Sequence, residues 1–320
     1  MYRIFYHGDP DGICSAALVR NYLHLDDEEC KFYEMQYNIL FPMYDIEFPD
    51  IVFIVDFSIR PDEMKELLDI TPNVYWIDHH ISAIDKYKGF HYISKFDICY
   101  GKGFNDFADN IMGLRRDGVA GCKLVWEFFQ QYVPYFLYED KIIKLNVDKL
   151  AFPELPIIVD YVADWDVFKL DYGESTKQFI LGFNAKGYKP TDLSKASLRS
   201  IQLQSCLIDD GATIQNYVKM LSKDADAFEV NIDGFKGLAL NIPFKSSLWY
   251  TGIDGYEDYD FLISYCYMSN GRWNYSIYDV SRNKFDCQEY AKRFGGGGHR
   301  GAAGMITDEF IIPYIMKTES

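Results

Sequence analysis

Imidazole and carboxylate side chains gather in short segments of the first half of the sequence. The earliest segment, HGDPDG at residues 7–12, holds one histidine and two aspartates. Side chains at alternate positions of an extended segment point to the same side, so His7, Asp9 and Asp11 could converge on one ligand. An ordinary turn, in which an aspartate caps the following helix, explains this segment about equally well when it is taken alone.

Further carboxylates and histidines directly follow apolar runs. Asp56 ends the run at 51–55, and Asp78, His79 and His80 follow the run YWI at 75–77. A lone aspartate at such a position is often a helix cap, but after a buried strand it still needs a hydrogen bond or a cation. Surface or core histidines beside a capping aspartate are the ordinary interpretation of 78–80. Two adjacent histidines are nevertheless unexpected in a chain that has only six.

A fourth segment, YVADWD at 161–166, places Asp164 and Asp166 among apolar residues at the end of a predicted helix. The four segments together hold several aspartates, at least two histidines and no cysteine, which is the composition of a dinuclear metal site. Carboxylates with imidazoles suit Mn²⁺ better than an all-oxygen Mg²⁺ site does, and the thiolates of structural zinc are missing. We therefore expect two divalent ions, Mn²⁺ first and Mg²⁺ as the alternative, which together can clamp the oxygens of a phosphoryl transfer.

Four consecutive glycines at 295–298 precede His299 and Arg300. Consecutive glycines let backbone N–H groups surround an anion, and the histidine and arginine would add donors. A flexible hairpin is the structural alternative. Because the glycines directly follow a predicted helix, we favour an anion-binding loop.

Strand and helix patterns alternate over the first 166 residues, which predicts a parallel sheet in an α/β domain. Predicted strands cover residues 2–7, 32–37, 51–57 and 74–77, and predicted helices cover 13–24, 61–68, 118–132 and 154–166. The polar segments fall at the carboxyl ends of three of these strands. Ligands collect at that edge of open α/β sheets, so these elements should bring the polar side chains together.

The region 184–213 is polar and rich in turn residues, and we place the domain junction in or near it. A connecting helix is predicted at 214–228, strands at 228–240, 259–268 and 272–280, and a capped helix at 286–294. The expected organisation is a metal-binding α/β domain at 1–190, a linker with its connecting helix at 191–227, and a smaller α+β domain at 228–320.

The formal net charge is −16. Long nucleic acid is held mainly by Lys and Arg on its phosphates, so we expect no binding of long duplexes. A short anionic substrate can still bind where metal ions supply positive charge. Seven scattered cysteines without a CxxC pair indicate reduced thiols. We read no signal peptide and no membrane-length apolar run, which predicts a cytoplasmic protein with no membrane partner. The oligomeric state stays open, a homodimer included.

Taken in order, five motifs resemble those of the DHH/DHHA1 phosphoesterase superfamily, which includes RecJ-type exonucleases and nanoRNases (oligoribonucleases). They are HGDPDG at 7–12, VDFS at 55–58, IDHH at 77–80, VADWD at 162–166 and GGGGHRGAAG at 295–304. The resemblance covers almost the whole chain. It implies a parallel-sheet DHH domain and a smaller DHHA1 domain, with the active site in the cleft between them.

The resemblance also implies metal ligands. One ion would be held by His7, Asp9 and Asp56. The second would be held by Asp11, Asp56, His79 and Asp164, so that Asp56 bridges the pair. Asp166 lies in the same motif as Asp164 and stays open as the alternative ligand, although we prefer Asp164.

Other residues take roles in catalysis and substrate binding by the same resemblance. Asp78 would orient the histidine pair and His80 would face the substrate phosphate, so Asp78, His79 and His80 form the catalytic group. In the C-terminal domain the terminal phosphate or ribose of the substrate would be held by Gly296, Gly297, Gly298, His299, Arg300 and, in a looser match, Arg282.

The implied function is a metal-dependent phosphodiesterase that hydrolyses short oligonucleotides to nucleoside monophosphates with metal-activated water. The short spacing of the first motif and the glycine-rich end exclude a family II pyrophosphatase. The same site would also serve cyclic or linear dinucleotides, or phosphoadenosine phosphate. A non-catalytic nucleotide-binding module is the alternative from another class, but a dead site need not keep so many charged groups together.

Overall fold

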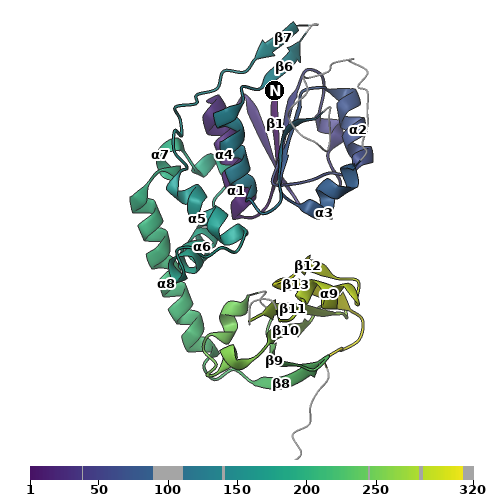
Figure 1. Ribbon diagram of the computed structural model, residues 1–320, viewed down its shortest axis with the longest axis vertical. Helices are drawn as coiled ribbons and strands as arrows, with labels where there is room; N and C mark the ends of the chain where they lie inside the picture. Colours follow the sequence, from purple (N-terminus) through teal and green to yellow (C-terminus); the bar gives the residue numbers. More distant parts are fainter. Residues whose placement is uncertain (38, 89–110, 139–140, 244–245, 281–283, 313–320) are drawn as a thin grey trace, which may run out of the picture. The chain divides into compact units, whose positions relative to one another are not determined.

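The computed structural model describes the chain except residues 38, 89–110, 139–140, 244–245, 281–283 and 313–320. It divides into a first unit, Met1–Ala212, and a second unit, Thr213–Ser320, each of which is described by itself (Figure 1). None of the described helices combines the length and the apolar character that a membrane crossing requires.

The first unit is built on a five-stranded parallel sheet with the strand order β2-β1-β3-β4-β5. Its strands are β1 (Tyr2–His7), β2 (Cys30–Met35), β3 (Ile51–Val55), β4 (Val74–Asp78) and β5 (Met112–Arg115). β3 and β4 are buried along their whole length, as near-continuous apolar sequences require. Val55 pairs with both Tyr6 and Ile77, so the chain leaves β1, β3 and β4 at one edge of the sheet.

Helices cover both faces of this sheet (Figure 1). One face carries α1 (Pro10–Leu23), α4 (Gly121–Gln131) and α5 (Ile157–Asp166), and the other carries α2 (Pro61–Ile70). The unit also contains α3 (Ile81–Ile84), the hairpin β6 (Tyr135–Tyr138) and β7 (Lys141–Lys144), α6 (Glu174–Lys186) and α7 (Lys195–Leu198). Short 3₁₀ turns lie at Met43–Asp45, Asp85–Tyr87 and Pro190–Asp192.

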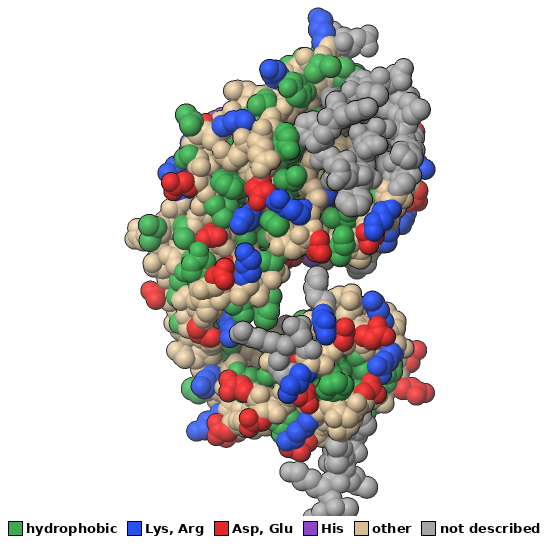
Figure 2. Space-filling model, viewed as in Figure 1, with side chains coloured by type: hydrophobic (Ala, Val, Ile, Leu, Met, Phe, Trp, Pro, Cys, Tyr) green, Lys and Arg blue, Asp and Glu red, His purple; other side chains and the backbone are tan. Residues whose placement is uncertain are grey.

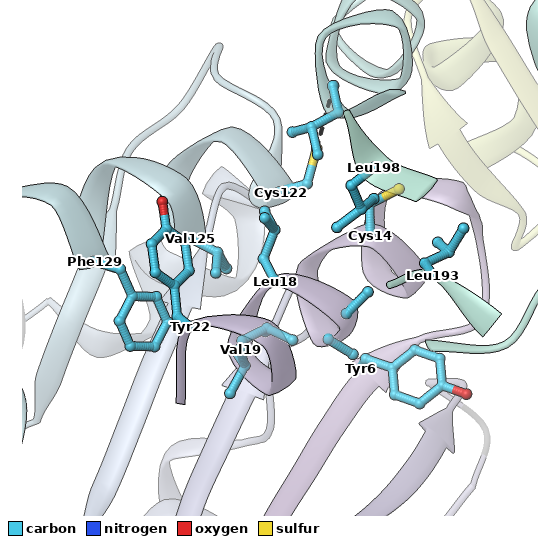
Figure 3. Packing of buried hydrophobic residues seen from close by; sticks show 14 of the residues in the cluster. Tyr6, Cys14, Leu18, Val19, Tyr22, Cys122, Val125, Phe129, Leu193 and Leu198 are labelled. Carbon is cyan, nitrogen blue, oxygen red and sulfur yellow. Dashed lines mark hydrogen bonds between the residues drawn. The ribbon is translucent and has the colours of Figure 1, made fainter. Parts of the chain in front are cut away.

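Alternate strand residues separate two cores, because successive side chains of a strand point to opposite faces. Phe53 belongs to the core beneath α1 and α4, and its neighbour Ile54 belongs to the core beneath α2. Figure 3 shows part of the first core, in which the rings of Tyr22 on α1 and Phe129 on α4 stack with centroids 4.7 Å apart. This contact lies near the carboxyl ends of α1 and α4 and packs the two helices against each other.

The second unit contains a six-stranded mixed sheet with the order β12-β13-β11-β10-β9-β8 and the helix α9 (Cys287–Lys292). Its strands are β8 (Ala227–Ile232), β9 (Phe235–Asn241), β10 (Phe261–Tyr267), β11 (Trp273–Asp279), β12 (Gly297–His299) and β13 (Ala302–Thr307), with 3₁₀ turns at Ser247–Tyr250 and Tyr256–Asp258. β9 and β10 are parallel and the other described pairs are antiparallel. The predicted class, a parallel-sheet α/β domain followed by a smaller α+β domain, is confirmed.

The predicted junction differs from the structure in its details. The region 184–213 was expected to be rich in turns, but α8 (Ile201–Ser222) already begins within it and continues past the division between the units. The misleading residue is Gly211, which follows two aspartates like a turn residue. A Cβ at Gly211 would collide with the carbonyl oxygen of Gln178 on α6, so this glycine allows two helices to approach closely.

The strand predicted at 228–240 is a hairpin of β8 and β9. Its two turn residues, Asp233 and Gly234, have φ angles of 55° and 87°. Positive φ at both central positions is what a tight two-residue hairpin turn demands. The Asp-Gly pair was the sequence signal for this turn.

Candidate metal centre

The first polar segment serves as a helix cap and as part of a site at the same time. Asp9 is the N-cap of α1, and its Oδ1 accepts a hydrogen bond of 3.0 Å from the backbone N–H of Gly12. Its Oδ2 lies 2.7 Å from Nδ1 of His7. Burial by itself would lower the pKa of His7, but the hydrogen bond and the charge of Asp9 raise that pKa above its ordinary value. The two interpretations of this segment are therefore compatible.

Asp11 holds the N-terminus of α4. Its carboxylate, only 2% exposed, accepts hydrogen bonds from the backbone N–H groups of Gly121 at 2.6 Å and Cys122 at 2.7 Å. The N-cap residue of α4, Ala120, has no side chain that could satisfy these groups. The first N–H groups of a helix lack partners within the helix and carry partial positive charge, so they are a good seat for a carboxylate.

Gly121 leaves space for two carboxylates, a role that the sequence interpretation did not assign. A Cβ at this position would lie 2.7 Å from Cβ of Asp56, 2.9 Å from its Oδ1 and 3.1 Å from Oδ2 of Asp11. The available signal was a glycine near the start of the helix predicted at 118–132, directly after Ala120, whose side chain cannot cap a helix.

Asp56 lies at the centre of the cluster. It is 1% exposed and has a φ of 50°, so the chain turns sharply as it leaves β3. Its Oδ1 lies 3.1 Å from Nε2 of His79, and its Oδ2 has no hydrogen-bond partner among the described residues. Burial, followed by the negative charges of Asp11 and Asp9, raises the pKa of Asp56 well above its usual range.

Asp78 fixes the orientation of the loop that follows β4. Its Oδ1 accepts a hydrogen bond of 2.8 Å from the backbone N–H of His79 and lies 2.7 Å from Nδ1 of His80. Its other oxygen accepts a hydrogen bond from the hydroxyl of Ser58, a contact that the sequence interpretation missed. Burial would raise the pKa of Asp78, but the bond to His80 and the charge of that ring lower it. The carboxylate is thus occupied in holding other groups.

The carboxylates of Asp164 and Asp166 make different contacts. The carboxylate of Asp164 accepts hydrogen bonds from the backbone N–H of Asp171 at 2.8 Å and from the hydroxyl of Thr176. Oδ2 of Asp166 instead lies 3.5 Å from Nε2 of His79. The structure therefore brings Asp166 to the cluster and not the preferred Asp164. Residues i and i+2 of a helix point in directions about 200° apart around the helix axis. Only one of Asp164 and Asp166 can therefore face the end of β4.

The charge environment of Asp166 agrees with this placement. Burial and then the charges of Asp11 and Asp9 raise the pKa of Asp166 to about 9. Its Oδ2, like that of Asp56, is buried without a hydrogen-bond partner among the described residues. Two orphaned carboxylate oxygens beside several like charges are costly unless a cation is bound.

Within the described part of the chain, three overlapping sets of side chains have ligand atoms within 4.8 Å of one another. They are His7–Asp9–Asp56, Asp56–His79–His80 and Asp11–His79–Asp166. Asp56 and His79 each belong to two sets, as expected where two ions share ligands. The donors in these sets are carboxylate and imidazole, without thiolate. The residues present therefore fit two divalent cations.

The residues predicted in the second unit belong mainly to a hairpin. Gly297 and Gly298 lie in β12, and a Cβ at Gly296 would collide with the carbonyl oxygen of Gly304. Gly298 has a φ of 147°, and its Cβ would lie 2.6 Å from the carbonyl oxygen of Ala302. A Cβ at Gly297 would meet open space, and the Arg300 side chain is exposed. Arg282 and the side chain of His299 lie outside the described residues.

A protein-family model matches the part of the chain that holds most of this cluster. Residues 2–152 match the family model described as the DHH family, N-terminal domain. This range contains the segments around His7, Asp56 and Asp78 and ends before Asp166. No curated protein matches the sequence.

Three solved structures resemble the chain at low sequence identity. One is the DHH domain of a member of a family of ribosomal proteins, with 11% identity and a TM-score of 0.52, covering 96% of this chain and 82% of that chain. A pGpG-specific phosphodiesterase from Vibrio cholerae has 12% identity and a TM-score of 0.48, covering 96% and 93%. Exonuclease RecJ bound to manganese has 16% identity and a TM-score of 0.43, covering 96% and 86%. The first of the three shows a shared fold.

Proposed function

This chain belongs to the DHH family, and from that premise we propose that it is a metal-dependent phosphodiesterase that hydrolyses short oligonucleotides to nucleoside monophosphates. One observation carries the proposal. At the carboxyl edge of the parallel sheet, two buried carboxylate oxygens without hydrogen-bond partners among the described residues, on Asp56 and Asp166, converge with the imidazoles. Such an arrangement suits divalent cations and phosphoryl transfer.

The proposed metal sites follow from the sets of ligand atoms. One ion would be held by His7, Asp9 and Asp56, and the second by Asp11, Asp56, His79 and Asp166. Asp166 replaces Asp164 here because of their different contacts. We propose Mn²⁺ for both, with Mg²⁺ as the alternative. Divalent ions at such a site supply a lowered pKa for water and charge neutralisation for phosphoryl oxygens.

The chain itself positions the reacting groups. Asp11 is fixed by two N–H groups of α4, and so presents its remaining lone pairs in one direction. Asp78 holds Nδ1 of His80, so that Nε2, on the other side of the ring, would face a phosphate. Because these contacts already exist without substrate, the site is preorganised for charge that develops on the phosphoryl oxygens.

Substrate binding is proposed to involve the second unit as well. Gly296, Gly297, Gly298, His299, Arg300 and Arg282 would hold the terminal phosphate or ribose. Gly297 has the open surroundings that a backbone contact with an anion needs. We further propose a cytoplasmic location.

Charge supports a short substrate. The net charge is −16, and on the face seen in Figure 2 basic and acidic side chains are interspersed over the described residues. Each phosphate outside the site would meet repulsion more often than Lys or Arg. We therefore expect kcat/KM to fall as oligonucleotide length grows, and to fall more steeply at low salt.

A product assay tests the proposal. The chain, stripped with a chelator and reloaded with Mn²⁺ or Mg²⁺, is offered RNA and DNA of graded length, from dinucleotides upward, together with cyclic dinucleotides and phosphoadenosine phosphate. Release of nucleoside monophosphates that needs the metal and is greatest for the shortest oligonucleotides supports the proposal. Failure to hydrolyse any of these substrates with either metal would refute the proposal. A preference for a cyclic dinucleotide would show that this compound, and not a short oligonucleotide, is the substrate.

A further inference from the structure

Tyr37 is an exposed aromatic residue at the rim of the metal centre. It lies two residues beyond the end of β2. Its ring centroid lies 6.0 Å from that of His7 and 6.0 Å from that of His80. On another side it packs on Phe57, with ring centroids 4.9 Å apart. The residue is nevertheless 58% exposed, so part of its ring is open to a ligand.

A single exposed aromatic ring is ordinary on protein surfaces. The evidence for a role of Tyr37 is therefore its position and not its exposure alone. Tyr37 lies beside both a proposed metal ligand, His7, and the proposed phosphate-facing residue, His80. Its support is rigid, because Phe57 is 3% exposed and its carbonyl oxygen accepts a hydrogen bond of 3.1 Å from Nε1 of Trp76. A rigidly backed aromatic ring beside a phosphate site has little to offer an inorganic phosphate, but it matches the face of a base.

We propose that Tyr37 is a stacking platform for the base of the nucleotide whose phosphate lies at the metal centre. The inference rests on the proposed function and adds to it a substrate class: esters that carry a base close to the scissile phosphate, in preference to inorganic or base-free phosphates. One sugar separates the base and the phosphate of a nucleotide, which is a separation of the same order as that between Tyr37 and the two histidines.

Tyr44, in the stretch that follows β2, offers a matched control. Tyr44 is 88% exposed and lies in the 3₁₀ turn Met43–Asp45, without a described ring contact to the histidines. Tyr44→Leu therefore removes an exposed tyrosine of the same stretch without touching the site. Tyr37→Leu removes the aromatic face, whereas Tyr37→Phe keeps the face and removes only the hydroxyl.

Binding to the full Mn²⁺-loaded chain is measured by calorimetry with adenosine 5′-monophosphate and with ribose 5-phosphate, which lacks the base. Stacking of a base on an aromatic side chain is worth about 5- to 150-fold in affinity. We expect the monophosphate to bind tighter by a factor in this range in the wild type, Tyr37→Phe and Tyr44→Leu. We expect Tyr37→Leu to lose most of that ratio while its affinity for ribose 5-phosphate stays the same.

Hydrolysis separates this inference from the proposed function. The substrates are a dinucleotide and its counterpart in which the base beside the scissile phosphate is replaced by hydrogen. Tyr37→Leu should raise KM for the dinucleotide and leave KM for the base-free counterpart unchanged. The stacking role would be wrong if Tyr37→Leu hydrolysed the dinucleotide with an undiminished preference over the base-free counterpart. It would also be wrong if Tyr37→Phe and Tyr37→Leu lost this preference equally. Either result would leave the proposed phosphodiesterase activity intact. Absence of all phosphodiester hydrolysis would overturn the proposed function itself.

Discussion

The metal centre of the first unit and the glycine hairpin of the second unit were both singled out by unusual residues, but the structure treats them differently. In the metal centre, Asp56 and Asp166 each keep a buried oxygen without a described hydrogen-bond partner. In the hairpin, Gly296 and Gly298 have a steric reason to be glycine, because a side chain would collide with β13. Residues that cost stability indicate function, whereas residues that packing already explains do not.

The same contrast appears inside one helix. Asp164 is buried and satisfied by Asp171 and Thr176, whereas Asp166 is half-buried and keeps one buried oxygen without a hydrogen-bond partner among the described residues. The sequence presents the two as equivalent carboxylates in one motif. Their hydrogen bonds make one structural and leave the other available to a cation.

The largest effect is expected from Asp56→Asn. Loss of the shared carboxylate should lower kcat/KM more than about a hundredfold, because both proposed ions use it. The metal-free protein should be at least as stable as the wild type, because burial and neighbouring carboxylates oppose the ionisation of Asp56, a cost that Asn does not carry. Thermal unfolding with and without Mn²⁺, beside the product assay, measures both. A large loss of metal-free stability would show instead that Asp56 is a structural residue.

Asp166→Asn and Asp164→Asn should separate the two carboxylates. The first should remove the part of the stabilisation by Mn²⁺ that comes from the second ion, and most of the activity, with little change in metal-free stability. The second should destabilise the protein by about 1–3 kcal/mol, because donors at Asp171 and Thr176 lose a charged acceptor. Denaturant unfolding with and without Mn²⁺ provides the measurement. The reverse pattern would return the ligand role to Asp164.

Much of the first unit could be predicted from its sequence because its signals are local. The apolar runs of β3 and β4 and the Pro at the start of α2 each specify their own structure. Parallel strands then bring their carboxyl ends to one edge, so Asp56 and His79 could be predicted to meet without knowledge of the packing.

The remaining features depend on contacts between distant segments. Gly121 matters because α4 begins against Asp11 and Asp56, and Gly211 lies inside α8 because α6 passes close to it. Asp166 was not preferred over Asp164 because the choice depends on the rotation of α5 about its axis. None of these contacts is encoded in spacing along the chain.

Gly121→Ala tests whether the space at the start of α4 belongs to the site. The added methyl group would press on Cβ of Asp56 and on the carboxylate of Asp11 and shift both. We expect a loss of about 10- to 100-fold in Mn²⁺ affinity, as for other changes that reposition ligands, with the fold retained. Gly301→Ala in the second unit, where a Cβ meets nothing within 4 Å, is the control. Equal Mn²⁺ affinities in the two variants would show that the site tolerates the displacement.

The smallest effects are expected in the glycine hairpin, where they can still decide between its two interpretations. Gly296→Ala forces a methyl group against β13 and should destabilise the protein by about 1–3 kcal/mol, as overpacking does. Gly297→Ala meets open space and should leave the stability unchanged. If the Gly297 backbone contacts an anionic end of the substrate, the methyl group should raise KM by about fivefold, the equivalent of one weakened hydrogen bond, without changing kcat. An unchanged KM in Gly297→Ala would leave the glycines with packing as their whole explanation, and would restrict substrate recognition to the first unit and to residues beyond this hairpin.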